Sequence, residues 1–121
     1  MKRDDLIDVD RGISLFNRGM YFEAHEAWEK VWISLDESPE KSFIQGLIKI
    51  AAALHHYRRK EFDGAVRLLE SGAVLIRRSL ENPWLIDAPG LLDQVKIFSR
   101  KMEVSTEPAE TTFPAIRKQE G

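Results

Sequence analysis

The chain has 121 residues, of which 43% are hydrophobic and 31% charged, with no cysteine and a formal net charge of −2. A chain of this length forms one domain and buries about two-thirds of the surface that it exposes when unfolded. The composition excludes disulfides, thiolate metal sites and a cysteine nucleophile. The near balance of charges gives no basic field for nucleic acid, and no apolar run approaches the roughly 18 residues of a membrane span. The acidic start of the chain contains no apolar signal segment, so we expect a cytoplasmic protein without membrane contact.

Apolar residues recur with the 3.6-residue period of an α-helix over most of the sequence. The first helix is predicted over residues 4–18, where Gly19 ends it, and the second begins at Tyr21. Pro39 favours a helix start, and the element that follows it, residues 40–59, is the longest. Its wide apolar face predicts a central, buried helix whose core positions are Leu47, Ile50, Ala51 and Leu54.

A fourth helix is predicted over residues 63–80, and a last one follows the break at Asn82-Pro83. We therefore expect a single helical bundle domain over residues 1–102. The tail, residues 103–121, is rich in Thr, Glu and Pro and is expected to be extended or disordered. Three apolar side chains in this tail could still dock on the bundle, namely Phe113, Pro114 and Ile116.

A weak internal repeat relates two helix junctions. The pattern Phe16-x-x-Gly19-x-Tyr21-x-x-Ala24 aligns with Tyr57-x-x-Lys60-x-Phe62-x-x-Ala65 further along the chain. An aromatic residue, a turn, a second aromatic residue and a small residue are typical of tetratricopeptide-like helical hairpins. The sequence thus predicts an all-α fold, a compact bundle of about five helices built on two such hairpins.

The second helix carries a dense group of acidic residues around one histidine. His25 and Glu29 lie one turn apart, Glu26 lies beside them, and Glu23 is rotated toward solvent. A half-buried imidazole against a carboxylate could take part in proton transfer or hold a divalent cation. The alternative is a solvated acidic face in which His25 is a hydrogen-bonded boundary residue.

The third helix has a polar stripe that includes Gln45 and His56, while His55 lies at the edge of its apolar face. Because only a short loop joins the second and third helices, they should run antiparallel, with the first turn of one beside the last turn of the other. The candidate ligand-binding residues are therefore Glu23, His25, Glu26, Glu29, Gln45, His55 and His56, and the candidate metal ligands are His25, Glu29 and His56. Gln45 lies about 16 Å from His56 along the helix axis and could serve the fold instead. A salt-bridge network from these acids to Arg58 or Arg59 is the structural alternative.

Several of these stretches together resemble a known family. They are Phe16-Asn17-x-Gly19-x-Tyr21-Phe22-Glu23-Ala24-His25-Glu26, Phe43-Ile44-Gln45-Gly46-Leu47-Ile48 and Ala51-Ala52-Ala53-Leu54-His55-His56. Over roughly residues 8–80 the chain is similar to domain-of-unknown-function family three hundred and nine, small all-helical bacterial and archaeal proteins. The resemblance implies a compact helical bundle with no established activity. It also implies that the recurrent positions are Glu23, His25, Glu26, Glu29, Gln45, Gly46 and either His55 or His56.

Two departures from the family pattern affect these expectations. Lys49 stands where Gln is frequent, so the cluster could be more basic than in the family. Lys60-Glu61 stands where Gly-Asn is common, so the second turn is expected to be less sharp. Gly46 in the interior of a helix is expected to mark the close approach of another helix.

Two functions from different classes fit these observations. The first is an interaction or ligand-binding module, which self-associates as a homodimer or docks a partner peptide between the hairpins. The second is a metal-dependent enzyme, such as a hydrolase, in which His25, Glu26, Glu29 and His55 or His56 act with a divalent metal. The sequence contains no catalytic signature that decides for the enzyme.

Overall fold

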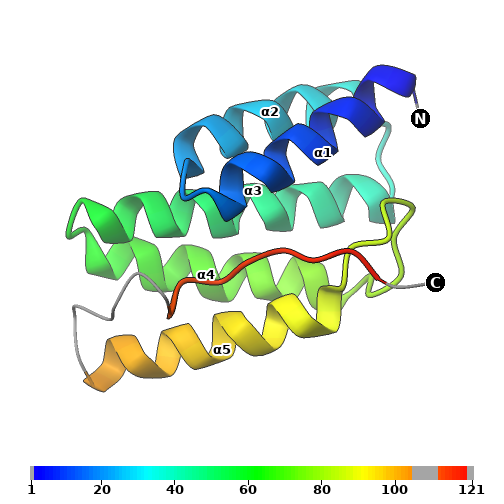
Figure 1. Ribbon diagram of the computed structural model, residues 1–121. Helices are drawn as coiled ribbons and strands as arrows, with labels where there is room; N and C mark the ends of the chain where they lie inside the picture. Colours follow the sequence, from blue (N-terminus) through cyan, green and yellow to red (C-terminus); the bar gives the residue numbers. More distant parts are fainter. Residues whose placement is uncertain (1, 105–111, 120–121) are drawn as a thin grey trace.

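The structure of the protein is a computed structural model that describes residues 2–104 and 112–119 (Figure 1). It contains the five helices α1 (Arg3–Asn17), α2 (Tyr21–Ser34), α3 (Pro39–Arg58), α4 (Phe62–Arg77) and α5 (Ala88–Val104). The described residues contain no strand, and their β-type pairing is limited to an isolated bridge between Ile86 and Lys118. The predicted all-helical bundle is confirmed. Helix α4 ends earlier than predicted, so Leu80 lies in the following loop.

The helices pack as a layered bundle with α3 in its centre (Figure 1). Helices α1 and α2 form an antiparallel pair on one side of α3, and α4 and α5 lie on the other side. Helix α3 begins at Pro39, as predicted, and Ser38 caps it because the Ser38 side-chain oxygen accepts a hydrogen bond from the Lys41 amide. None of the helices in the described residues is both long and apolar enough to cross a lipid bilayer.

The core of the bundle is built around α3. The four positions predicted to be buried, Leu47, Ile50, Ala51 and Leu54, are fully buried. Helix α4 packs against α3 at closely approaching glycines, since a Cβ atom added to Gly46 would lie 2.9 Å from the carbonyl oxygen of Gly72. The predicted reason for a glycine at position 46 is therefore confirmed.

The two turns that were predicted to repeat have the same backbone geometry. Gly19 has φ of 79° and Lys60 has φ of 64°, both in the left-handed region. The residues that follow, Met20 and Glu61, both have φ of −93° and ψ of 70°. In each turn two amides bond back to the last helical turn, as in a Schellman motif. The expectation of a less sharp second turn was wrong, because Lys60 adopts the conformation that Gly19 adopts.

The tail returns to the bundle after α5. Helix α5 continues past the expected domain boundary at residue 102, and the predicted tail of residues 103–121 includes residues 105–111 and 120–121, which lie outside the described residues. Residues 112–119, hereafter the C-terminal segment, run in an extended path along the bundle between α1 and α5 (Figure 1). Ile116 in this segment is only 2% exposed and belongs to the hydrophobic core.

The wide apolar face of α3 is covered within the chain. Phe43 stacks on Trp84 of the loop before α5, with ring centroids 5.9 Å apart, and Tyr57 meets Phe113 of the C-terminal segment at 5.7 Å. Among the described residues, α3 has no exposed large apolar side chain that could form a dimer surface. A homodimer stays a prediction.

Candidate functional site

His25 forms the pair that its spacing predicted. Its Nε2 atom lies 2.9 Å from Oε1 of Glu29, and its side chain is 26% exposed. The ring stacks on Phe22, with centroids 6.3 Å apart, and Phe22 also meets His55 of α3 at 5.6 Å. These contacts confirm that the first turn of α2 lies beside the last turn of α3.

His56 faces a different carboxylate. Its Nδ1 atom lies 2.9 Å from Oε1 of Glu61, in the turn between α3 and α4, and the same oxygen lies 3.3 Å from Nε of Arg59. The hydrogen bond to His56 and the charge of Arg59 lower the pKa of Glu61. Sequence reasoning missed Glu61 as a partner, because a turn residue five positions after a helical histidine shows no helical spacing.

The predicted metal ligands His25, Glu29 and His56 are divided between two pairs. In residues 2–104 and 112–119, which include all the candidates, no group of three or more His, Asp or Glu residues is placed to hold a metal ion. His25 instead meets Glu29 within α2, and His56 meets Glu61 in the turn after α3. The structure therefore does not assemble the expected ligand set.

The remaining candidates lie around these pairs without joining them. Glu26 is exposed, and Glu23 and Gln45 are partly buried. Within the described part of the chain, the side chains of these three residues form no hydrogen bond or ion pair. Arg58, expected to compensate the acids, donates a hydrogen bond to the Gly19 carbonyl and lies over the ring of Tyr21. Arg58 thus links the end of α3 to the turn between α1 and α2.

Two buried nitrogen atoms on α2 have no hydrogen-bond partner among the described residues. They are Nδ1 of His25 and Nε1 of Trp32. With Nε2 of His25 donating to Glu29, Nδ1 is left as a lone-pair acceptor, which fixes the tautomer of the neutral ring. The His25 ring therefore has one buried nitrogen that the described residues leave unused.

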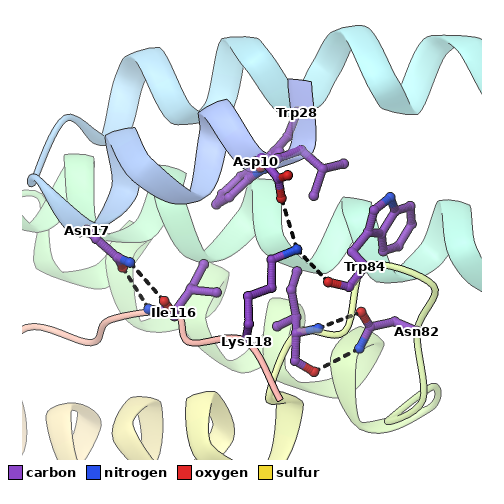
Figure 2. A network of polar contacts seen from close by, with 9 residues as sticks. Asp10, Asn17, Trp28, Asn82, Trp84, Ile116 and Lys118 are labelled. Atoms are coloured by element: carbon purple, nitrogen blue, oxygen red, sulfur yellow. Dashed lines mark hydrogen bonds and ion pairs between the residues drawn. The ribbon is translucent and has the colours of Figure 1, made fainter. Parts of the chain in front are cut away.

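A second site, which the sequence did not predict, holds the C-terminal segment. The side-chain amide of Asn17, the last residue of α1, bonds both backbone groups of Ile116: Nδ2 donates to the carbonyl oxygen at 2.8 Å, and Oδ1 accepts from the amide at 2.7 Å (Figure 2). Gln94 of α5 makes the same two bonds to Ala115: Nε2 donates to the carbonyl oxygen at 3.0 Å, and Oε1 accepts from the amide at 2.9 Å. Two amide side chains on different helices thus form hydrogen bonds with the backbone of two successive residues in an extended segment.

The loop before α5 binds the next residues of the segment through backbone hydrogen bonds. The Asp87 amide donates to the Arg117 carbonyl at 2.8 Å, and the Gln119 amide donates to the Leu85 carbonyl. Asn82 holds the loop in shape by bonding both backbone groups of Ile86, at 3.0 and 2.9 Å (Figure 2).

The side chain of Lys118 spans from the segment to α1. Its Nζ atom lies 2.9 Å from Oδ1 of Asp10 and also donates to the Trp84 carbonyl (Figure 2). We call the surface that holds the segment the docking site, and it is formed by Asp10, Asn17, Gln94 and the backbone of residues 84–87. The sequence signal for it was the group of apolar residues in a polar tail, which indicated docking but no partner.

The bundle also carries a surface hollow of about 650 Å³ between α4 and α5. Its lining includes Leu69, Ala73 and Leu92, and charged side chains such as Arg77 and Lys96. The candidate site residues on α2 and α3, hereafter the His/Glu cluster, do not line this hollow. The residues of the docking site do not line it either.

Comparison with known proteins shows that the first part of the chain is similar to one family. Residues 9–68 match the model of the family described as Domain of unknown function (DUF309). Uncharacterized protein YpuF of Bacillus subtilis (strain 168) is 35% identical over 57 residues, a match that covers 47% of this chain and 33% of the relative. The chain thus matches about a third of the length of that curated relative. The family match runs from α1 into α4, so Gln94 and the C-terminal segment lie outside it. Through residues 9–68, the chain is thus similar to the DUF309 family, as the sequence motifs indicated.

Proposed function

We propose that the protein is an interaction module that binds an extended segment of a protein partner at the docking site. The observation that carries this proposal is the double hydrogen bonding of two successive residues, Ala115 and Ile116, by the amides of Gln94 and Asn17. These bonds engage backbone groups that every residue except proline carries. A site of this kind can therefore accept an extended chain in general, and side-chain contacts add selectivity.

The position of the two amides supports this function. Asn17 ends α1 and Gln94 lies within α5, so rigid helices hold both amides before any segment arrives. Preorganised side chains reduce the entropy cost of binding. In this proposal the C-terminal segment is an occupant of the site supplied by the chain itself.

The His/Glu cluster serves the fold in this proposal. The contact of Phe22 with His55 and the bond from Arg58 to the Gly19 carbonyl hold the first hairpin (α1 and α2) against the end of α3. The hairpins, taken as tetratricopeptide-like, then present α1 to the segment. The ligand-binding role of Glu23, His25, Glu26, Glu29, Gln45, His55 and His56 stays a prediction, and no observation on the described residues favours the metal-dependent enzyme.

Binding of a labelled peptide in trans tests the proposed function. The full chain with Ile116→Asp should release its own segment, because a carboxylate cannot replace a buried isoleucine side chain. A fluorescent peptide of residues 112–119 should bind this variant saturably in an anisotropy titration. It should bind the unmodified chain more weakly, since a tethered segment competes at an effective concentration on the order of mM.

Two further variants sharpen this test. Asn17→Ala, added to Ile116→Asp, should weaken peptide binding, while Gln45→Ala removes an amide outside the docking site and should leave binding unchanged. The proposal fails if the folded Ile116→Asp chain binds no peptide, or if both amide variants behave alike.

A further inference from the structure

We infer that the partner segment carries an aromatic residue, an aliphatic residue three positions later and a lysine two positions after that. This inference rests on the proposed function and names the partner by the side chains that the docking site accepts. In the C-terminal segment these positions are Phe113, Ile116 and Lys118. Each of them meets a distinct part of the bundle.

The aromatic position is partly buried and contacts rings from three helices. Phe113 stacks on Tyr21 of α2 with ring centroids 5.9 Å apart, and it meets Phe98 of α5 at 5.0 Å and Tyr57 of α3 at 5.7 Å, both edge-to-face. The guanidinium of Arg58 lies 5.1 Å from the same ring. Edge-to-face pairs and a cation over a ring are specific to aromatic side chains, so an aliphatic residue would lose these contacts.

The aliphatic position is buried in the core, and an amide side chain binds its backbone groups. Ile116 is 2% exposed, and its backbone is fixed by Asn17. In an extended chain three residues span about 10 Å, so a fixed backbone at this point also fixes where an aromatic residue three positions earlier must fall. The site therefore fixes the three-residue spacing between the aromatic and the aliphatic position.

The lysine position is defined by two acceptors from different elements. The carboxylate of Asp10 and the carbonyl of Trp84 both meet Nζ of Lys118. The side chains of Lys118 and Asp10 are 45% and 63% exposed, so solvent weakens the ion pair. The pair therefore contributes more to selectivity than to affinity. A segment with an acidic residue at this position would be disfavoured, because its carboxylate would face that of Asp10.

Peptides tested against the full Ile116→Asp chain measure this selectivity. Compared with the peptide of residues 112–119, the peptide with Phe113→Ala should bind about tenfold more weakly. The peptide with Lys118→Glu should bind about fivefold more weakly. The peptide with Arg117→Ala changes an exposed residue and should stay within about twofold.

A charge exchange makes the test specific to the lysine position. On a chain that carries both Ile116→Asp and Asp10→Lys, the peptide with Lys118→Glu should bind more tightly than the unmodified peptide. The same order of affinities should hold on Ile116→Ala and on the unmodified chain, where all values are weaker. These two chains keep the test valid if Ile116→Asp does not fold.

The outcomes separate this inference from the proposed function. If all the peptides bind with equal affinity, the inferred pattern is overturned while peptide binding itself stands. If the preference at position 118 does not reverse on the Asp10→Lys chain, the lysine part of the pattern is overturned. If no peptide binds any chain, the proposed function falls and this inference falls with it.

Discussion

Asn17 and Ile116 lie 99 positions apart in the chain, yet the Asn17 side chain bonds both the amide and the carbonyl group of Ile116, at 2.7 and 2.8 Å. Replacing Asn17 with Ala should lower the free energy of unfolding by about 1–3 kcal/mol, because it leaves two backbone groups of a buried residue unpaired. Urea denaturation measures this loss. Hydrogen exchange should also become faster at the Ile116 amide, and an unchanged exchange rate there would show that the pair does not hold the segment.

The contact between α3 and α4 gives a prediction with a matched control. Gly46→Ala should destabilise the protein by about 1–3 kcal/mol, because the added Cβ would lie 2.9 Å from the carbonyl oxygen of Gly72. Gly64→Ala, in the first turn of α4, has open space around its Cβ and should stabilise the protein by up to about 1 kcal/mol. Thermal unfolding of both variants checks the opposite signs, and a shift of the same sign for both would contradict the packing described here.

The sequence predicted the helices well because they are amphipathic over several turns. The central position of α3 and the close approach at Gly46 followed from periodicity and residue size, which are local properties. The docking site was not predictable in this way, since Gln94 and Ala115 meet through the fold and an extended segment of eight residues has no period to detect.

The histidine cluster shows the same division between local and tertiary information. The pairing of His25 with Glu29 followed from helical spacing, and the contact between the start of α2 and the end of α3 followed from the short loop that joins these helices. The choice of Glu61 by His56 depends on the turn that Lys60 makes in its left-handed conformation. Backbone conformation of this kind is not expected of a lysine from the sequence.

Trp28 and His25 lie on the same helix but should differ strongly in their contribution to stability. Trp28 is fully buried, and its Nε1 atom donates to the Val9 carbonyl at 3.2 Å, so Trp28→Ala should cost about 3–5 kcal/mol. His25→Ala removes a partly exposed pair within one helix and should cost about 1 kcal/mol or less. Urea denaturation measures both costs, and circular dichroism should show helical content near that of the unmodified chain for His25→Ala. Equal losses would mean that the cluster is a main stabilising element.

The pair of Glu61 with His56 predicts that the free energy of unfolding depends on pH in the acidic range. The hydrogen bond from His56 lowers the pKa of Glu61 in the folded protein from its usual value of 4.5. A lowered pKa stabilises the folded state above the unfolded pKa, and this stabilisation is lost as the pH falls through the folded pKa. Below about pH 4.5, the unmodified chain should therefore lose more stability than Glu61→Gln in unfolding experiments. Glu26→Gln, at an exposed acid, is the control and should follow the unmodified chain. A Glu61→Gln profile parallel to that of the unmodified chain would argue against the pair.

The central claim is that Asn17 and Gln94 hold an extended peptide backbone supplied by a partner. Isotope-filtered nuclear magnetic resonance on the full Ile116→Asp chain, mixed with an isotope-labelled peptide of residues 112–119, measures this directly. The account predicts intermolecular nuclear Overhauser effects from the Asn17 side-chain amide to the backbone amide of Ile116 in the peptide, and from the Gln94 amide to that of Ala115. A bound peptide that shows contacts only elsewhere on the bundle, such as the hollow between α4 and α5, would contradict it.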